Sequence, residues 1–316
     1  MIVVPEEFAR CTVEREGEPG AAWLAGLPGI VEELLGRWGH VPDGTVTHGG
    51  VGIVVPVRRR GDGAERASVL KVSFPHPGNV HEPDAFAVWA GRGAVGLYAR
   101  DDGHFAMLLE RARTSTLAEV GDADELAEVA GRLSRRLAVP APRDHPQLPR
   151  LSGQAGAWED QLRKDAKELA HTMSPSTVDA AAATVRELGR EQPELLVHGD
   201  LHARNILRAE REPWLAVDPK GCVGDPAYDA GTLLTSRTPA LLDAPDPGKA
   251  AHRILDIFGE AAELDRVRVQ RWAQLRFVQA AFWGRRHGFR VARGGPGLDV
   301  ITQFADRLAE LLARRA

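Results

Sequence analysis

The sequence has 316 residues, with 40 lysines and arginines against 44 aspartates and glutamates and a net charge of −4. At about 100 to 200 residues per domain, this length predicts one large domain or two lobes. The hydrophobic and charged fractions of 43% and 27% exclude a disordered, collagen-like or coiled-coil chain. The slightly acidic balance provides no basic surface for nucleic acid or for an anionic membrane, so we expect neither as a partner.

The cysteines and the apolar runs indicate the compartment. Cys11 and Cys222 are the only cysteines and lie far apart in the sequence, which is typical of a reducing compartment. The first residues lack the basic and apolar segments of a signal peptide, and no later run approaches the roughly 18 apolar residues of a membrane span. We therefore expect a cytoplasmic protein.

Strand patterns dominate the first part of the chain. Residues 45–73 place β-branched side chains between glycine clusters, with a turn expected at 60–63. A helix pattern follows at about 82–89, and an apolar strand at 105–109.

Helix patterns dominate after residue 110. Apolar residues recur at three- and four-residue spacing in 124–137, 156–171, 177–188 and 250–314. The proline-rich stretch 139–150 is expected to form an ordered surface loop, and two strands are expected between 195 and 217. The sequence thus predicts an α+β fold with a small β-rich N-terminal lobe, residues 1–111, and a larger, mainly helical C-terminal lobe, residues 112–316.

The segment HGDLHARNIL, residues 198–207, carries the densest group of chemically active side chains. Strand-like residues 206–208 and 214–217 are separated by a polar turn that suits an antiparallel hairpin. Such pairing places Asn205, before the first strand, beside Asp218, after the second. An amide oxygen next to a carboxylate is a hard oxygen pair, so we expect Asn205 and Asp218 to bind Mg²⁺.

Asp200 lies five residues before Asn205. This order matches the phosphotransfer template, in which one aspartate accepts the proton of the nucleophile and an asparagine and a later aspartate bind metal. We predict that Asp200 is the catalytic base. In an alternative interpretation, His198, Asp200 and His202 hold Zn²⁺ or Fe²⁺ in a hydrolase, but that site leaves Asn205 and Asp218 unexplained.

Four neighbouring side chains have roles that the sequence leaves open. His198 is expected to brace the loop through hydrogen bonds. His202 and Lys220 are candidate contacts with phosphate or substrate, although Lys220 is expected first of all to pair with Asp225. Asp225, a further candidate contact, or Asp229 is expected to cap a helix.

The spacing of the two aspartates limits the substrate class. Asp225 follows Asp218 by only seven residues. This distance leaves no room for a regulatory activation segment, so we expect a small-molecule substrate rather than a protein.

The first part of the chain supplies a candidate nucleotide site. Lys71 lies among apolar strand residues, where a buried ammonium needs a partner. Glu82, at the start of the next helix pattern, is the expected partner in an ion pair that presents Lys71 to the phosphates of ATP. Other expected nucleotide contacts are the backbone of Gly49, Gly50 and Gly52 at the phosphates and the backbone from Glu110 to Ala112 at the adenine edge.

The chain resembles the aminoglycoside phosphotransferase family, in particular its branch of streptomycin 6-phosphotransferases and hydroxyurea phosphotransferases. The motifs that show this are AAWLAGLP, VLKV, MLLER, HGDLHARNIL, REPWLAVDPKG and VGDPAYD. The resemblance implies a protein-kinase-like two-lobed fold, MgATP as donor and a small hydroxylated acceptor. It also implies the roles given above for Asp200, Asn205, Asp218, Lys71 and Glu82. The chain departs from kinases in its irregular glycine loop and in DPKG at the metal motif.

Streptomycin and hydroxyurea are the expected acceptors, and an unrelated small metabolite is the alternative. A polycation such as streptomycin needs carboxylates, and the C-terminal half offers Asp225, Asp229, Asp243, Asp246, Asp256, Glu260 and Glu263. The aromatic residues Trp272, Phe277, Phe282 and Trp283 line either an acceptor pocket or the core. A nucleotide-binding pseudoenzyme is a further alternative, although it gives no physical reason to retain all four of Asp200, Asn205, Asp218 and Lys71.

Overall fold

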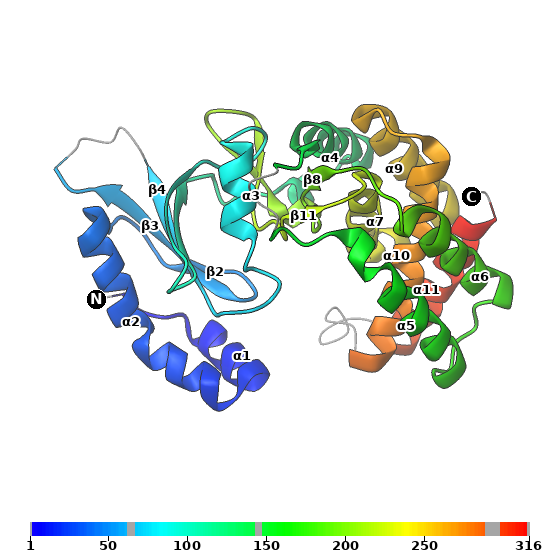
Figure 1. Cartoon of the computed structure of the whole chain (residues 1–316), viewed down its shortest axis with the longest axis horizontal. Helices are drawn as coiled ribbons and strands as arrows, with labels where there is room; N and C mark the ends of the chain where they lie inside the picture. Colours follow the sequence, from blue (N-terminus) through cyan, green and yellow to red (C-terminus); the bar gives the residue numbers. More distant parts are fainter. Residues whose placement is uncertain (1, 62–66, 143–146, 288–297, 315–316) are drawn as a thin grey trace.

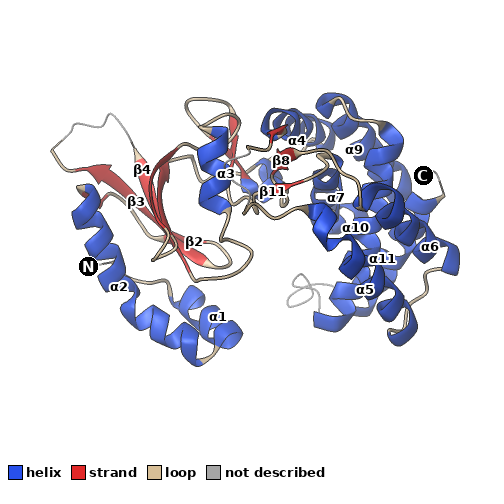
Figure 2. Ribbon diagram, in the orientation of Figure 1, coloured by secondary structure: helices blue, strands red, loops and turns tan. Residues whose placement is uncertain are grey.

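The computed structural model describes residues 2–61, 67–142, 147–287 and 298–314. Within these ranges the chain forms an N-terminal part built on a β-sheet and a mostly helical C-terminal part (Figure 1). Figure 2 shows the same division, with the long strands on one side of the molecule and most of the helices on the other. The predicted α+β fold class is confirmed.

The N-terminal sheet has the strand order β1-β3-β4-β6-β5, with β2 paired to β3 and every pair antiparallel. Its strands are β1 (His40–Pro42), β2 (Thr47–His48), β3 (Gly52–Arg59), β4 (Ser68–Ser73), β5 (Leu97–Asp101) and β6 (Ala106–Glu110). Residues on β4 and β6 alternate between the two faces of the sheet, as the period of two requires. Leu70 and Leu108 belong to one hydrophobic cluster, whereas Met107 and Leu109 belong to another.

Helices cover both faces of this sheet. The helices α1 (Glu6–Glu16) and α2 (Glu18–Trp38) pack on one face, where their buried apolar residues join those of β3 and β4. The helix α3 (Glu82–Trp89) lies on the side of the helical part (Figure 1), and its Phe86 and Trp89 join the large cluster of the C-terminal part. The start of α3 is therefore held close to the junction of the two parts.

The C-terminal part is built on eight helices in the described ranges: α4 (Ala123–Leu137), α5 (Ala155–Glu168), α6 (Pro175–Thr184), α7 (Ala227–Ser236), α8 (Thr238–Leu242), α9 (Pro247–Ala262), α10 (Arg266–His287) and α11 (Leu298–Ala313). Two small antiparallel sheets complete it. One joins β7 (Val139–Pro140), β8 (Leu195–Val197) and β11 (Cys222–Val223), and the other joins β9 (Ile206–Arg208) and β10 (Trp214–Ala216). None of the described helices is long and apolar enough to cross a membrane.

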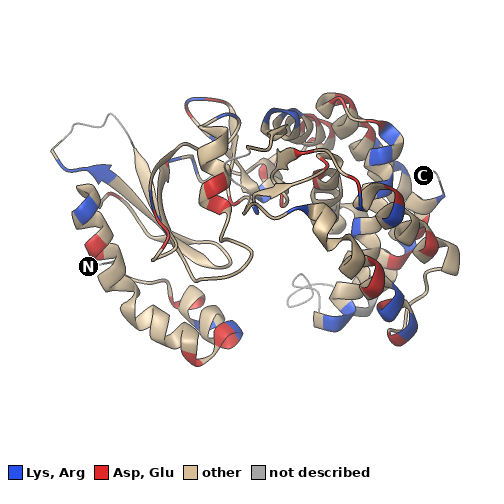
Figure 3. Ribbon diagram, in the orientation of Figure 1, with Lys and Arg blue, Asp and Glu red and all other residues tan. Residues whose placement is uncertain are grey.

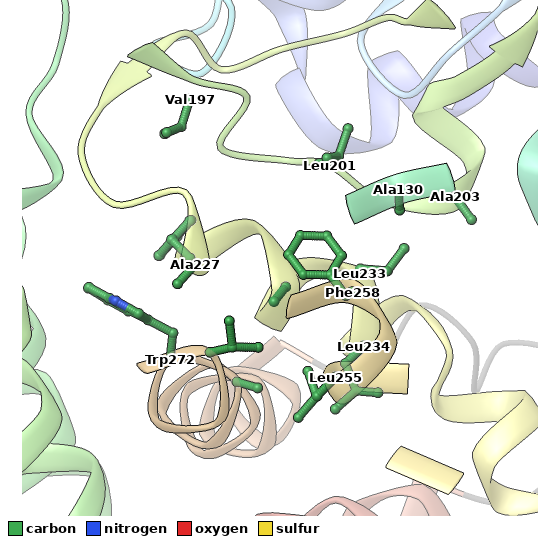
Figure 4. Close-up of a cluster of buried hydrophobic side chains, with 14 of the residues drawn as sticks. Ala130, Val197, Leu201, Ala203, Ala227, Leu233, Leu234, Leu255, Phe258 and Trp272 are labelled. Atoms are coloured by element: carbon green, nitrogen blue, oxygen red, sulfur yellow. The ribbon is translucent and has the colours of Figure 1, made fainter. Parts of the chain in front are cut away.

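The large hydrophobic cluster supports the segment after β8. Figure 4 shows Val197 and Leu201, which flank this segment, above the apolar side chains of α7, α9 and α10. Leu201 is fully buried, as are Leu233 on α7 and Phe258 on α9. The polar residues between Val197 and Leu201 are thus anchored at both ends by buried apolar neighbours.

Most predicted elements are present, with local differences. The stretch 139–150 begins with a short strand, β7, because Val139 and Pro140 pair with β8. The sequence did not predict α1, α2, β1 or β5. The turn expected at 60–63, the loop expected at 139–150 and the helical pattern expected at 250–314 each include residues outside the described ranges.

Candidate active site

The loop that joins β8 to β9 contains Asp200 and Asn205. It turns at Gly199, whose φ of +78° is a left-handed conformation that glycine adopts without steric cost. A Cβ atom at this position would also lie 2.7 Å from the Cys222 Sγ atom. Glycine is therefore required at position 199 for two reasons, the left-handed backbone conformation and the lack of room for a side chain next to Cys222.

The His198 side chain holds this loop through hydrogen bonds to backbone groups. Its Nε2 donates to the Val217 carbonyl (2.9 Å), and its Nδ1 accepts from the Asp200 N–H (3.2 Å). Burial lowers the pKa of His198 to about 4, so the ring is neutral. Because both ring nitrogens are occupied by backbone groups, His198 is not placed as a metal ligand. Among the described residues, no three His, Cys, Asp or Glu side chains are grouped to hold a metal ion, so the geometry gives no support to the metal-hydrolase alternative.

Asp229 on α7 is a second residue that holds this loop, whereas the sequence analysis considered it as a helix cap or as a carboxylate for a polycationic acceptor. The carboxylate accepts the Gly199 N–H at 2.9 Å and is almost fully buried. Burial raises the pKa of Asp229 to about 7, although backbone N–H groups of Leu201 and Gly199 oppose the increase. A polar residue within the apolar start of α7 is the sequence signal for such a role.

The predicted hairpin is present and positions Asn205 and Asp218 at its open end. Ala216 pairs with Ile206, and the Val217 N–H donates to the Asn205 carbonyl at 2.9 Å. Asp218 is thus one residue beyond the position opposite Asn205. The Asn205 Nδ2 donates to the Asp200 carbonyl (3.0 Å), which leaves its Oδ1 as the acceptor atom. Asp218 has a φ of +57°, a conformation that is uncommon for residues with a side chain.

Lys71 connects the two parts of the molecule. Its ammonium lies 2.5 Å from the Glu82 Oε1 and 2.6 Å from the Asp218 Oδ1. The expected ion pair with Glu82 is confirmed, and a second carboxylate joins it. Burial favours the neutral amine, but the Asp218 and Glu82 charges outweigh it and raise the pKa of Lys71. Burial likewise opposes the ionised form of Asp218, but Lys71 holds its pKa below the ordinary value.

The glycine turn between β2 and β3 lies next to Asp218. A Cβ atom on Gly49 would be 3.8 Å from the Asp218 Oδ2. The Gly49 N–H is used by the Gly52 carbonyl, and the Gly50 carbonyl accepts from Arg15. The loop therefore lies beside Asp218, but the Gly49 N–H is not available to a phosphate in this conformation.

The segment expected to contact adenine follows β6. The N–H groups of Glu110 and Arg111 donate to the carbonyls of Gly96 and Ala67. The N–H of Ala112 has no partner among the described residues. Ala112 is therefore the residue of this segment whose N–H is free to bind a ligand.

The expected pairing of Lys220 with Asp225 is wrong. The Lys220 ammonium lies 3.9 Å from the Asp200 Oδ2 instead. Asp225 is 1% exposed and is occupied by Arg268, by the Trp272 indole N–H (2.6 Å) and by the Ala227 N–H at the start of α7 (3.0 Å). Asp225 is therefore a structural residue at the helix start and not a contact for phosphate or substrate.

His202 retains the character of a candidate contact. Its backbone N–H donates to the Asp200 carbonyl, and its Nδ1 is buried without a partner among the described residues. It lies on the same short loop as Asp200. Its predicted role stays a prediction.

Comparison with known proteins decides the family. Residues 37–288 match the family described as aminoglycoside/hydroxyurea antibiotic resistance kinase. The chain belongs to this family. It is therefore a kinase, an enzyme that transfers phosphate to a hydroxyl acceptor.

Individual relatives agree with this result. The kinase is 37% identical to the streptomycin 6-kinase of Streptomyces griseus over 99% of this chain and 98% of that one. It is 35% identical to the hydroxyurea phosphotransferase of Kitasatospora aureofaciens over 90% of this chain and 80% of that one. A spectinomycin phosphotransferase solved in complex with ADP and spectinomycin has the same fold, with a TM-score of 0.51, 12% identity and coverage of 90% and 97%.

Proposed function

We propose that this kinase transfers the γ-phosphoryl group of MgATP to a hydroxyl of a small antibiotic-like acceptor. The observation that carries the proposal is the position of the Lys71 ammonium between Glu82 and Asp218, with the loop of Asp200 and Asn205 beside Asp218. Phosphoryl transfer needs little covalent chemistry from the protein and depends on positioning and charge. The side chains named above supply both the positioning and the charge.

Asn205 and Asp218 are the residues that would hold Mg²⁺. The free Asn205 Oδ1 and the ionised Asp218 carboxylate are the hard oxygen donors that this ion prefers. When bound, Mg²⁺ neutralises negative charge on the phosphates. Lys71 adds a positive charge to the site. Its ion pair with Glu82 keeps the ammonium in place next to Asp218.

Asp200 would orient the acceptor and take its proton. In the transfer, the acceptor oxygen forms a bond to the γ-phosphorus, the bond from that phosphorus to the β-phosphate oxygen breaks, and ADP leaves. The proton of the hydroxyl passes to the Asp200 carboxylate. The Lys220 ammonium lies 3.9 Å from the Asp200 Oδ2, on the same side of the site.

The remaining nucleotide contacts and the domain limits extend the proposal. The turn of Gly49, Gly50 and Gly52 would cover the phosphates, and the free N–H of Ala112 next to Glu110 would bind the adenine edge. We place the boundary between the nucleotide-binding lobe and the acceptor-binding lobe at residues 111 and 112. A cytoplasmic location fits the two free cysteines.

Streptomycin and hydroxyurea are the first acceptors to test, because relatives that cover most of the chain bear those names. The assay measures ATP consumption with Mg²⁺ and the mass of the product, which must increase by one phosphate. Phosphorylation of another metabolite would support the proposed kinase activity but would assign it a different acceptor. Binding of MgATP without any turnover would favour the pseudoenzyme alternative.

The role of Asp200 is tested with Asp200→Asn. General-base catalysis contributes about 10²- to 10⁴-fold, so kcat should fall by at least that range. The affinity for MgATP should change little, because Asp200 is not among the proposed metal or phosphate ligands. Asp160→Asn, on the exposed surface of α5, is the matched control and should keep full activity. Unchanged turnover in Asp200→Asn would remove Asp200 from the mechanism.

A further inference from the structure

A cavity of about 910 Å³ lies between α5 and α10 in the C-terminal part. Its wall includes Trp158, Leu162, Asp165, Arg276, Trp283 and Arg286. The volume is within the range of about 300 to 1,000 Å³ that is typical of pockets for drug-sized ligands. Trp283 is 49% exposed, in contrast to Trp272, Phe277 and Phe282, which are core residues. Of the four aromatic residues considered from the sequence, Trp283 is the one that lines this cavity.

Neighbouring residues of α7 contact the cavity wall and the active-site loop. Tyr228 precedes Asp229, which holds the Gly199 N–H beside Asp200. The Tyr228 ring stacks on Trp158 with 6.0 Å between ring centroids. The Arg276 guanidinium lies over the same Tyr228 ring, 4.8 Å from its centroid. Two wall residues of the cavity are therefore in contact with the residue next to the brace of the catalytic loop.

Arg276 is held in place by its neighbours but has no anionic partner in the described part of the chain. Its stem fits against α7 at Gly231, where a Cβ atom would lie 2.5 Å from the Arg276 Cγ. Its Nη1 donates to the Gln279 amide oxygen (3.2 Å), and its Nε is buried without a hydrogen-bond partner among the described residues. No carboxylate of the described residues pairs with it. A half-buried guanidinium without a carboxylate partner among the described residues is suited to a carbonyl or carboxylate oxygen of a ligand.

Among the described residues, the rest of the cavity wall offers no free negative charge. Asp165 is buried and is bound by Arg286 and by the Gln161 amide (2.7 Å). None of the seven carboxylates considered from the sequence for a polycation lines the cavity. Several of them have other partners, since Asp246 caps α9 and Glu263 pairs with Arg135. Figure 3 shows acidic and basic segments interspersed over the helices of the C-terminal part.

We propose that this cavity is the acceptor pocket and that Arg276 selects an acceptor that is neutral or anionic and offers a carbonyl or carboxylate oxygen. This inference rests on the proposed function and narrows its acceptor class. A polycation such as streptomycin would meet an unpaired positive charge at the wall, and a like charge in a partly buried site opposes binding.

The experiment compares the wild type with Arg276→Gln and Arg276→Lys on three probes. These are streptomycin, a polycation, and two neutral carbonyl compounds, hydroxyurea and chloramphenicol. The measured quantity is kcat/KM for each probe, divided into kcat and KM. Arg307→Gln, an exposed position on α11, removes the same charge away from the cavity and is the control.

We expect the wild type to prefer the neutral probes. We compare kcat/KM for a neutral probe with kcat/KM for streptomycin. In Arg276→Gln this ratio should fall by roughly tenfold through changes in KM, because one positive charge is removed close to the ligand. Arg276→Lys should keep the wild-type preference, and Arg307→Gln should resemble the wild type. A ratio that Arg276→Gln leaves unchanged overturns the inference, even if the kinase is active.

Failure of the proposed function has a different signature. If no probe is phosphorylated by any variant, the acceptor assignment of the proposed function fails. Titration of streptomycin into the folded proteins by calorimetry then decides the inference alone. Tighter binding to Arg276→Gln than to the wild type supports it, and equal affinity or no binding to either overturns it.

Discussion

At the scale of single residues, the catalytic loop is held by two buried titratable groups whose protonation affects stability in opposite directions. The pKa of Asp229 is raised from 3.8 to about 7 and that of His198 is lowered from 6.5 to about 4, both mainly by burial. Folded Asp229 keeps its proton to a higher pH than the unfolded chain does. Folded His198 stays neutral to a lower pH than the unfolded chain does.

Asp229→Asn isolates the first of these effects. Between pH 4 and 7 the unfolded carboxyl is ionised, while the folded one still binds a proton, so the contribution of Asp229 to the free energy of unfolding falls as the pH rises. The free energy of unfolding of the wild type minus that of Asp229→Asn should decrease by up to about 3 kcal/mol from pH 4 to 6.5. Urea denaturation at several pH values measures this. A difference that is constant with pH would show that the carboxyl is ionised throughout.

His198→Gln should give the reverse dependence. The contribution of neutral His198 is fully present above pH 6.5 and is lost as the pH falls toward 4, because the unfolded imidazole takes up a proton first. The difference between wild type and His198→Gln should therefore increase as the pH rises over the same window. The two variants act as controls for each other, since a general acid effect would move both differences in the same direction.

At the scale of elements, the close contact of α4 and α9 depends on Gly131. A Cβ atom there would lie 2.5 Å from the Phe258 carbonyl and 2.9 Å from the Ala261 Cβ, both on α9. Gly131→Ala should destabilise the protein by about 1 to 3 kcal/mol, because the helices must move apart. In Gly26→Ala, on α2, the new Cβ enters open space, and the variant should gain up to about 1 kcal/mol. Equal changes in the urea midpoint of the two variants would contradict the packing argument.

The elements that the sequence predicted are those with local signals. The β9–β10 hairpin was predicted because its two strands and its polar turn are adjacent in the chain, and its register brings Asn205 close to Asp218. The strand of Lys71 and the helix of Glu82 were predicted for the same reason, and the burial of Lys71 required a partner nearby. By contrast, β1 and β5 are edge strands with partly exposed residues, so alternation alone does not reveal them.

The incorrect prediction at Asp225 has a long-range cause. Its partners Arg268 and Trp272 belong to α10, more than 40 residues further along the chain, whereas Lys220 is its near neighbour in sequence. The brace formed by Asp229 was missed for a similar reason, because the Gly199 N–H lies 30 residues earlier. Contacts of this kind depend on how the helices pack, and no local pattern specifies them.

At the scale of the whole molecule, one ammonium connects the two parts of the chain. Lys71 lies on β4, Glu82 starts α3, and Asp218 follows β10 in the C-terminal part. A nucleotide bound at this point would contact both parts together. Its binding free energy should therefore stabilise the whole fold, and Lys71 and the metal ligands should control how large that effect is.

Thermal and urea unfolding with MgATP measure this coupling. At a ligand concentration 100 times the Kd, the free energy of unfolding of the wild type should increase by about 2.7 kcal/mol. Lys71→Met should lose most of the increase, because the phosphates lose their fixed positive charge, whereas Lys164→Met, exposed on α5, should keep it. In Asp218→Asn, the free energy of unfolding should increase by the same amount with ATP and Mg²⁺ as with ATP and a chelator, because one metal ligand has been removed. A wild-type increase that Lys71→Met retains in full would place the nucleotide away from Lys71 and would separate the ion pair from phosphate binding.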